Sequence, residues 1–341
     1  MKAWVIDRIN NLDETDEPLR PVDLPKPVPG EGEVLIQVSA CGVCHTELDE
    51  IEGRTPPLFF PIVPGHQVVG VVAETGGGNM ILQEGMRVGV AWIYSACGRC
   101  EFCRSGHENL CENFLGTGRD AHGGYAEYMV VPEKYAYPIP PVFSDTEAAP
   151  LLCAGAIGFR SLQLCNIKEH QVIGLMGFGA SAHLVLKFIK GRFPQNPVFA
   201  FARNPKERSF ALKLGADWAG AVNEQPPVLA DAIIDTTPAW EPIVSALEFL
   251  KPGGRLVINA IRKEPADQEQ LLNLNYEQHL WMEKEIKSVA NITGNDVKEF
   301  LRIAGKLKLH PEIEVYPFDK ANQAILDIKH RNIKGAKVLV L

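Results

Sequence analysis

Four cysteines that lie close together in the chain have the spacing of a metal site. Residues 97–111 follow the pattern Cys-x2-Cys-x2-Cys-x7-Cys, which lets one loop wrap four thiolates around a tetrahedral ion. Four soft ligands with no open position indicate a structural zinc ion, although an iron–sulfur cluster uses the same ligands. The predicted ligands are Cys97, Cys100, Cys103 and Cys111.

A second set of metal-ligating side chains is dispersed along the chain. Cys44 lies in the run Cys-Gly-Val-Cys-His-Thr-Glu of residues 41–47, and His66 follows about twenty residues later in Pro-Gly-His-Gln-Val-Val-Gly. Each is weak evidence alone, because a lone histidine is more often a hydrogen-bonded polar residue and a Cys-x2-Cys pair is also typical of redox sites. Their occurrence together favours a second metal site.

A glycine-rich turn follows the apolar run of residues 172–176. Residues 177–182, Gly-Phe-Gly-Ala-Ser-Ala, form a G-x-G-x-x-A version of the dinucleotide fingerprint. Gly177 permits the tight turn, Gly179 lets backbone N–H groups approach a pyrophosphate at a helix N-terminus, and Ala182 is small enough for helix–strand packing. The turn therefore predicts a dinucleotide site.

The elements that must position these residues change character near residue 150. Before it, short β-branched runs lie between Gly and Pro turns without helical periodicity, as in a small β-rich barrel. After it, strand-like runs alternate with helix-length segments, which predicts a parallel doubly wound sheet. The predicted strands are 33–38, 68–72, 87–91, 125–131, 171–176, 198–201, 232–235 and 255–260, and the predicted helices are 181–190, 205–214, 242–250 (ended by residues 252–254) and 295–306.

Composition excludes several classes of protein. A chain of 341 residues with 46% hydrophobic and 22% charged residues is a globular protein with room for two domains. A net charge of −8 argues against nucleic acid as a partner. We expect no membrane contact, since no apolar run reaches the roughly 20 residues of a membrane span. The start has no export signal, so eight cysteines predict a reducing, cytoplasmic location.

These motifs together resemble the zinc-dependent alcohol dehydrogenases of the medium-chain dehydrogenase/reductase superfamily. The C-G-V-C-H-T and G-H-x-x-x-G segments, the four-cysteine loop and the glycine-rich turn occur in that family's order and spacing, over essentially the whole chain. The resemblance implies an α/β fold with a GroES-like β-rich catalytic domain at residues 1–149 and 292–341. It also implies a Rossmann nucleotide-binding domain, with its doubly wound parallel sheet, at residues 150–291.

The resemblance further implies a catalytic zinc held by Cys44, His66 and Cys153, with the fourth position open for water or the substrate oxygen. A zinc ion in such a site lowers the pKa of an alcohol hydroxyl. Thr46 would bond that hydroxyl and start a proton relay, unless it only caps a helix. His45 would approach the cofactor pyrophosphate. With the four-cysteine loop, two zinc ions per chain are expected.

The chain departs from the family pattern at several places. Glu47 stands where an aspartate usually orients the zinc-binding histidine, a role that the longer carboxylate can fill. Gln67 replaces the usual glutamate after the histidine, and Asp49 replaces the histidine that ends the proton relay in many members, so turnover or its pH optimum is expected to change. Cys41 and Cys165 match no ligand position and are interpreted as core residues.

The choice of dinucleotide depends on the end of the second strand of the parallel sheet, where an acidic side chain binds the ribose 2′-hydroxyl of NAD. Alignment with the family places Ala202 there, followed by Arg203 and Asn204. A small residue and a cation leave room and charge for a 2′-phosphate, which favours NADP over NAD. Alternatively, Arg203 only stacks on the adenine.

We therefore expect reversible hydride transfer between a primary or secondary alcohol and NAD(P), giving an aldehyde or ketone. Trp92 and Phe59 are candidates for the wall of the substrate pocket or for plain core packing. The alternatives are an aldehyde or quinone reductase of the same superfamily and a zinc-stapled binding protein, which the charge and the intact cofactor turn oppose. The resemblance also implies a homo-oligomer, either a dimer or a tetramer.

Overall fold

A computed structural model of the chain describes residues 1–78, 80–330 and 335–341. Its backbone packing divides the chain into two compact units, which we call the first unit (residues 1–156 and 292–341) and the second unit (residues 157–291). The sequence predicts domain boundaries at 149/150 and 291/292, and these exact bounds stay a prediction. The α/β class is confirmed, because the first unit is rich in antiparallel strands and the second contains a parallel sheet.

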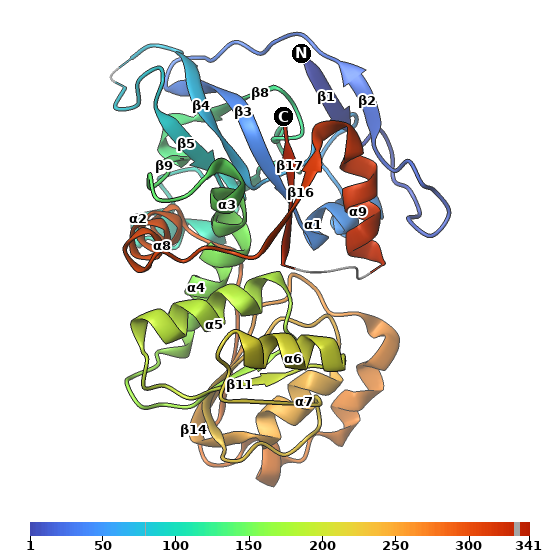
Figure 1. Cartoon of the computed structure of the whole chain (residues 1–341), viewed down its shortest axis with the longest axis vertical. Helices are drawn as coiled ribbons and strands as arrows, with labels where there is room; N and C mark the ends of the chain where they lie inside the picture. The colour runs from blue at the N-terminus through green and yellow to red at the C-terminus, as the bar shows by residue number, and fades with distance from the viewer. Residues whose placement is uncertain (79, 331–334) are drawn as a thin grey trace. The chain divides into compact units, whose positions relative to one another are not determined.

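The first unit is organised around β3, which pairs with β17, β4 and β8 in a seven-stranded sheet of order β16-β17-β3-β4-β5-β9. Its C-terminal strand β17 returns to pair antiparallel with β3, with Val338 opposite Gly42 (Figure 1). The strands of this unit are β1 (Lys2–Val5), β2 (Arg20–Asp23), β3 (Glu33–Val43), β4 (Val68–Thr75), β5 (Arg87–Val90), β6 (Ile93–Ser95), β7 (Leu115–Gly116), β8 (Tyr128–Pro132), β9 (Ala136–Pro138), β16 (Ile313–Pro317) and β17 (Ala336–Val340).

Helices of the first unit connect these strands, and α8 is the longest of those described. Thr293 caps α8 by accepting a hydrogen bond from the Asp296 amide at 3.1 Å, and apolar residues three and four apart face inward from it. The helices are α1 (His45–Ile51), α2 (Glu101–Arg104), η1 (Glu108–Leu110), η2 (Glu133–Tyr135), α3 (Asp145–Pro150), η3 (Leu151–Gly155), α8 (Gly294–Leu307), η6 (Phe318–Lys320) and α9 (Ala321–Lys329).

The second unit contains a six-stranded, all-parallel sheet of order β12-β11-β10-β13-β14-β15. The chain adds β11 and β12 on one side of β10 and then β13, β14 and β15 on the other side. The direction in which strands are added therefore reverses at β10. The elements are α4 (Ala156–Cys165), β10 (Ile173–Met176), α5 (Ala180–Arg192), β11 (Val198–Phe201), α6 (Pro205–Lys213), β12 (Trp218–Gly220), β13 (Ala230–Asp235), α7 (Glu241–Glu248), β14 (Leu250–Ile258), η4 (Pro265–Asn273), η5 (Tyr276–Leu280) and β15 (Glu285–Ser288).

The strands of the second unit are apolar because they lie in its core. Parallel strands covered on both faces are near-continuous hydrophobic runs, and all four residues of β10 and of β11 are buried. Phe201 stacks on Phe249 at a ring distance of 5.5 Å, and α7 contributes Ile243 and Leu247 to the same cluster. This packing holds the carboxyl ends of the strands in place, where cofactors bind in such sheets.

One predicted helix end is wrong. Residues 252–254, Pro-Gly-Gly, were expected to end a helix over 242–250, but α7 ends at Glu248 and the three residues lie inside β14. β14 tolerates them because its pairing with β13 is irregular there, with a register shift between Ala230 and Ala232.

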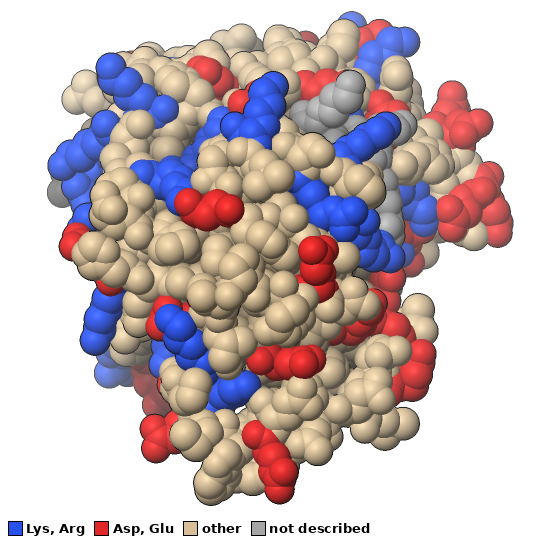
Figure 2. Space-filling view, turned by 60° about the horizontal axis from the view of Figure 1, so that its bottom comes forward, with Lys and Arg blue, Asp and Glu red and all other residues tan. Residues whose placement is uncertain are grey.

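One apolar helical run and the surface charges concern the expected absence of membrane and nucleic-acid partners. The helical run Asp145–Cys165 is long and apolar enough to cross a membrane by length and composition, but 67% of its most apolar window is buried inside the structure. Such burial is typical of a core helix. Basic and acidic side chains occur on the same face, with neutral surface between them (Figure 2).

Candidate metal centres and active site

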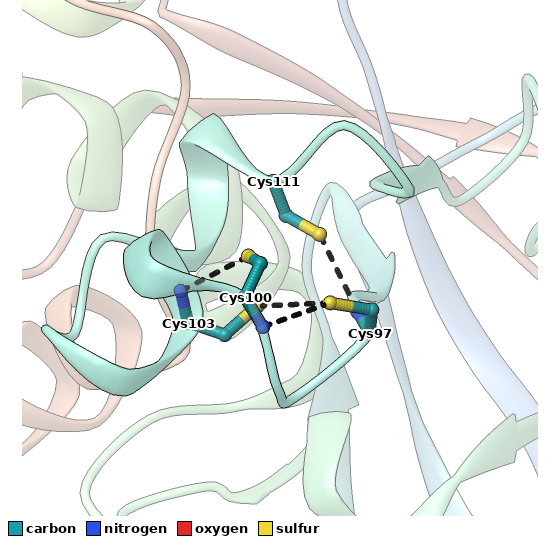
Figure 3. A group of neighbouring side chains, drawn as sticks. All are labelled: Cys97, Cys100, Cys103 and Cys111. Carbon is teal, nitrogen blue, oxygen red and sulfur yellow. Dashed lines mark hydrogen bonds between the residues drawn. The ribbon is translucent and has the colours of Figure 1, made fainter.

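The four-cysteine loop brings its sulfur atoms together. Cys97 follows β6, Cys100 caps α2, Cys103 lies within α2, and Cys111 follows η1. Their ligand atoms all lie within 4.8 Å of one another, and the Sγ atoms of Cys97 and Cys103 are 3.9 Å apart (Figure 3). Sulfurs bound tetrahedrally to zinc at about 2.3 Å lie about 3.8 Å apart, so the loop fits zinc.

Backbone amides surround these sulfurs. The amides of Cys97, Cys100 and Cys103 donate to the sulfurs of Cys111, Cys97 and Cys100 at 3.5, 3.4 and 3.4 Å. Backbone donors from Arg99 and Cys100 lower the pKa of the Cys97 thiol to about 6, whereas desolvation is the main cause that raises the pKa of Cys103 to about 12. Such N–H donors stabilise thiolate, the form that binds metal.

The loop is anchored by a carboxylate between its third and fourth cysteines. Glu108 Oε1 accepts a hydrogen bond from the Gly294 amide at 2.8 Å, at the start of α8. Its Oε2 accepts from Lys134 Nζ at 2.9 Å. The four-cysteine loop is therefore fastened to the C-terminal part of the first unit.

The dispersed ligands come from three separate elements of the first unit. Cys44 caps α1 directly after β3, His66 precedes β4, and Cys153 lies in the π-helical turn η3 between α3 and α4. Their ligand atoms lie within 4.8 Å of one another, and His66 Nε2 is 3.2 Å from Cys153 Sγ. Two thiols and one imidazole fit a zinc site with one position left for an exchangeable ligand.

Glycine allows the chain to bring His66 into this cluster. Gly65 has φ +96°, and a Cβ atom there would lie 2.3 Å from the Tyr125 ring. Its carbonyl oxygen accepts a hydrogen bond from the Gly124 amide at 2.9 Å. The turn before His66 therefore requires a residue without a side chain.

Glu47 organises the dispersed ligands from the first turn of α1. Its Oε1 lies 2.7 Å from His66 Nδ1, and its Oε2 accepts from the Cys44 amide at 2.7 Å. With Nδ1 held by the carboxylate, Nε2 is left to face the thiols. Hydrogen bonds from Cys153 and His66 hold the pKa of the Cys44 thiol well below its usual range, although burial raises it.

The other residues predicted around this cluster occupy different environments. Thr46 Oγ1 is 3.6 Å from Cys44 Sγ, and Cys44 rather than Thr46 is the cap of α1. His45 is exposed. Trp92 is buried, with its ring edge-on to His66 at 4.8 Å. Phe59 instead lies edge-on to the ring of His122, with 5.5 Å between ring centres, and lines a separate apolar pocket of about 400 Å³.

The departures from the family pattern also have defined environments. Asp49 is buried and accepts a hydrogen bond from Arg54 Nε at 2.6 Å, a pairing that no pattern in the sequence marks. Gln67 is buried, and a Cβ on Gly42 would lie 2.6 Å from its Oε1. Cys41 and Cys165 are buried, and burial raises the pKa of Cys165 to about 12.

A buried carboxylate near the cluster was also missed. Both oxygens of Glu50 are buried without a hydrogen-bond partner among the residues that the structure describes. Burial raises the pKa of its carboxyl well above the usual value, and the neighbouring charge of Glu47 adds to this rise. No pattern in the sequence separates Glu50 from the exposed acids of a helix, because its burial depends on the packing around α1.

The glycine-rich turn of the second unit follows β10 directly. Gly177 has φ +81°, and a Cβ there would lie 2.9 Å from Thr236 Oγ1 and from Thr237 Cγ2. Gly179 precedes α5, and a Cβ there would meet no atom within 4 Å. Ala182 is fully buried. The backbone at Gly179, directly before α5, thus leaves room on its side-chain face, as close approach of a pyrophosphate requires.

The end of β11 carries no acid. Ala202 is buried, Arg203 is exposed, and Asn204 caps α6 by accepting from the Lys206 amide at 2.9 Å. Arg208, one turn into α6, donates from Nη1 to the Ala202 carbonyl at 3.5 Å. A ribose at this strand end would therefore meet arginine side chains instead of a carboxylate.

Comparison with known proteins identifies the family. A family model described as the alcohol dehydrogenase GroES-like domain matches residues 30–141. A probable alcohol dehydrogenase of Mycobacterium tuberculosis, AdhA, is 38% identical over 348 residues, which cover 100% of this chain and 97% of the relative. An alcohol dehydrogenase of Geobacillus stearothermophilus is 31% identical over 354 residues, which cover 100% of this chain and 99% of the relative.

A solved structure has the same fold. The cinnamyl alcohol dehydrogenase of Sorghum bicolor superposes with a TM-score of 0.84 at 28% identity, covering 99% of this chain and 97% of that structure. Relatives more than 30% identical also span this whole chain. It therefore belongs to the zinc-dependent alcohol dehydrogenases of the medium-chain dehydrogenase/reductase superfamily and is an NAD(P)-dependent alcohol dehydrogenase.

Proposed function

We propose that the enzyme oxidises a primary or secondary alcohol reversibly to an aldehyde or ketone at a zinc ion held by Cys44, His66 and Cys153. A second zinc ion in the four-cysteine loop has a structural role. The observation that carries the proposal is the convergence of two thiols and one imidazole, with Glu47 2.7 Å from the far side of that imidazole.

The chain's own residues divide the chemistry between them. Zinc supplies a Lewis acid that lowers the pKa of the alcohol hydroxyl. Thr46 accepts the proton that leaves this hydroxyl and releases its own to water. Asp49 is not assigned the end of this relay, because it is paired with Arg54. A bound NAD(P)⁺ would supply the hydride acceptor, so that the alcohol would lose a hydride and a proton and become the aldehyde or ketone. His45 binds near the cofactor pyrophosphate.

The proposed cofactor site in the second unit favours NADP. Gly177, Gly179 and Ala182 shape the pyrophosphate turn, as in the fingerprint. Buried Ala202 and exposed Arg203 support a 2′-phosphate, because a guanidinium binds phosphate and residues 202–204 at the end of β11 include no acid. In the alternative, Arg203 only stacks on the adenine, and NAD serves as well.

The proposal includes a homo-oligomer and a cytoplasmic location. β15 forms one edge of the parallel sheet, and all four of its residues are exposed, including Ile286. Exposed edge strands invite pairing with another chain, which supports a homo-oligomer, a dimer or a tetramer. All eight cysteines are free, which supports the cytoplasm as the location.

The first experiment follows nicotinamide absorbance with zinc-loaded protein, a panel of alcohols and aldehydes, and NAD and NADP in parallel. We expect turnover that a chelator abolishes and a higher kcat/KM with NADP. Activity with quinones or enones that survives removal of zinc from the Cys44 site would instead favour the superfamily aldehyde or quinone reductase. Absence of turnover with bound zinc and nucleotide would contradict the alcohol dehydrogenase mechanism proposed here.

A matched pair of variants tests the cofactor preference. Arg203→Ala should lower kcat/KM for NADP roughly 10-fold or more and change that for NAD less than about 2-fold, because charge-assisted phosphate contacts are strong. Lys206→Ala, an exposed cation three residues away, is the control. Equal effects of Arg203→Ala on both dinucleotides would retire the 2′-phosphate role.

A further inference from the structure

A buried lysine in the second unit ties together the loops that follow β13 and β14. Asp235 ends β13 and is fully buried, and the side chain of Lys263, beyond the end of β14, is only 8% exposed. Lys263 Nζ donates to Asp235 Oδ2 at 2.5 Å and to the carbonyl oxygens of Thr237 and Ala239 at 2.8 and 2.9 Å. All three N–H donors of the ammonium group are therefore used.

Further hydrogen bonds join the same two segments. The Glu264 amide donates to the Pro238 carbonyl at 2.7 Å. Asp267 Oδ2 accepts from the amides of Trp240 and Glu241, both at 2.9 Å. The segments after β13 and β14 thus form one fastened layer, which we call the clamped loops (residues 236–241 and 259–267), with Lys263 at its buried centre.

The clamped loops lie directly against the glycine-rich turn. Thr236 Oγ1 donates to the Met176 carbonyl at 3.0 Å, at the end of β10. A Cβ on Gly177 would lie 2.9 Å from side-chain atoms of both Thr236 and Thr237. The shape of the turn therefore depends on where the loop after β13 is held.

The sheet order indicates which half of a dinucleotide these loops serve. In a doubly wound sheet, the dinucleotide spans the point where the strand order reverses, with one nucleotide on each side. Ala202 and Arg203, at the end of β11, lie on one side of β10 and suit the adenosine half. The loops after β13 and β14 lie on the other side, which leaves them the nicotinamide half.

We propose that Lys263 is a positioning residue for the nicotinamide half of the cofactor. It acts by holding the clamped loops in the conformation that receives the ring, and the inference rests on the proposed cofactor site at the Gly177 turn. Without the ammonium group, a buried carboxylate and two carbonyls lose their shared donor, so the loops must separate to reach water. Binding of the adenosine half, on the far side of β10, does not require this.

The experiment compares Lys263→Met with Lys251→Met. Lys251 Nζ pairs with Asp231 at 2.7 Å and joins the same two strands at their amino ends, so it is a more exposed ion pair between the same strands, away from the proposed site. Dissociation constants are measured for NADH and NADPH and, as probes of the adenosine half that lack the pyrophosphate, for AMP and adenosine 2′,5′-bisphosphate. Circular dichroism and Tm establish that each variant is folded.

Lys263→Met should raise the Kd of the preferred dinucleotide roughly 10-fold or more and that of the adenosine probes less than about 2-fold. Lys251→Met should change neither. Equal weakening of probe and dinucleotide by Lys263→Met, or no weakening at all, overturns the inference. If Lys263→Met does not fold, the double variant Asp235→Asn/Lys263→Met, which leaves no unpaired buried charge, is expected to show the same selective loss.

The same titrations separate this inference from the function on which it rests. Wild-type protein that binds neither dinucleotide would overturn the proposed cofactor site, and the inference with it. Wild-type protein that binds a dinucleotide, together with a Lys263→Met variant that binds it equally well, would overturn the positioning role alone.

Discussion

The two metal-binding groups of the first unit are built in opposite ways. The four-cysteine loop takes all its ligands from residues 97–111, whereas the dispersed group takes Cys44, His66 and Cys153 from three distant places in the chain. A group within one loop needs only the turns of that loop to bring its ligands together. A dispersed group requires the assembled sheet, and with three protein ligands it leaves a tetrahedral ion one position for chemistry.

The hydrogen-bond partners of the ligands also differ between the two groups. The sulfurs of the four-cysteine loop accept hydrogen bonds from backbone amides. Any sequence that forms these turns supplies such amides. The dispersed group depends on one side chain, because Glu47 holds both His66 Nδ1 and the Cys44 amide. We therefore expect the four-cysteine loop to govern stability and the dispersed group to govern activity, with little overlap.

The largest expected effect is that of His66→Ala. Removing this ligand should lower kcat/KM by roughly 10³-fold or more, since Lewis-acid stabilisation is worth several kcal/mol. One zinc ion per chain should remain, measured by atomic emission, and Tm should change by only a few degrees. Loss of both zinc ions would show that the two groups are not independent and would break the comparison.

Glu47→Gln should have a smaller effect on the same site. An amide of equal size cannot serve as the carboxylate partner of His66 Nδ1, and such changes typically cost 10–100-fold in metal affinity or activity. Zinc affinity by chelator competition and kcat/KM are the measurements, with Glu47→Asp as the variant that should restore part of both. Full zinc affinity and full activity in Glu47→Gln would contradict the orienting role.

Cys103→Ser tests the other group. Loss of its zinc should remove a few kcal/mol of stability, which lowers Tm by roughly 5–10 °C. The Kd for the dinucleotide and the turnover per remaining zinc ion should stay within about 2-fold of wild type at 25 °C. A proportionate loss of activity would instead indicate that the four-cysteine loop supports the dispersed site, through Glu108 and α8.

The smallest effect concerns pH and the four-cysteine loop after zinc removal. Backbone donors lower the pKa of Cys97 to about 6, so alkylation of this thiol should rise with a midpoint near pH 6, while Cys103, with a pKa of about 12, stays unreactive. Peptide mapping of iodoacetamide adducts measures both. An unfolded cysteine has a pKa of about 8.5, so the lowered pKa of Cys97 stabilises the folded, zinc-free protein. This stabilisation is fully present above about pH 8.5 and is lost as the pH falls through about 6.

Much of the fold could be predicted from the sequence, and the failures have a common cause. The strands over 33–38, 68–72 and 198–201 are found within β3, β4 and β11, because apolar periodicity is a local property. The edge strands β12 and β15 were missed, since they are short and β15 is fully exposed, so neither carries an apolar pattern. Their pairing depends on a neighbouring strand.

The candidate site divides in the same way. Cys153 entered the ligand set only through the resemblance to a family, because nothing near it in the sequence marks a ligand. The structure brings it within 3.2 Å of His66 by way of the π-helical turn η3. Phe59 lies against His122 in another pocket, and Asp49 is engaged by Arg54. None of these contacts follows from spacing.

By itself, the sequence determined the sites that are built from residues close together in the chain. The four-cysteine loop and the turn through Gly177 and Gly179 depend on the backbone geometry of a few consecutive residues. Only the tertiary structure decided that Cys44, His66 and Cys153 meet and that Lys263 is buried against Asp235. Such contacts join segments far apart in the chain, and their distances are set by how strands and loops pack around a shared core.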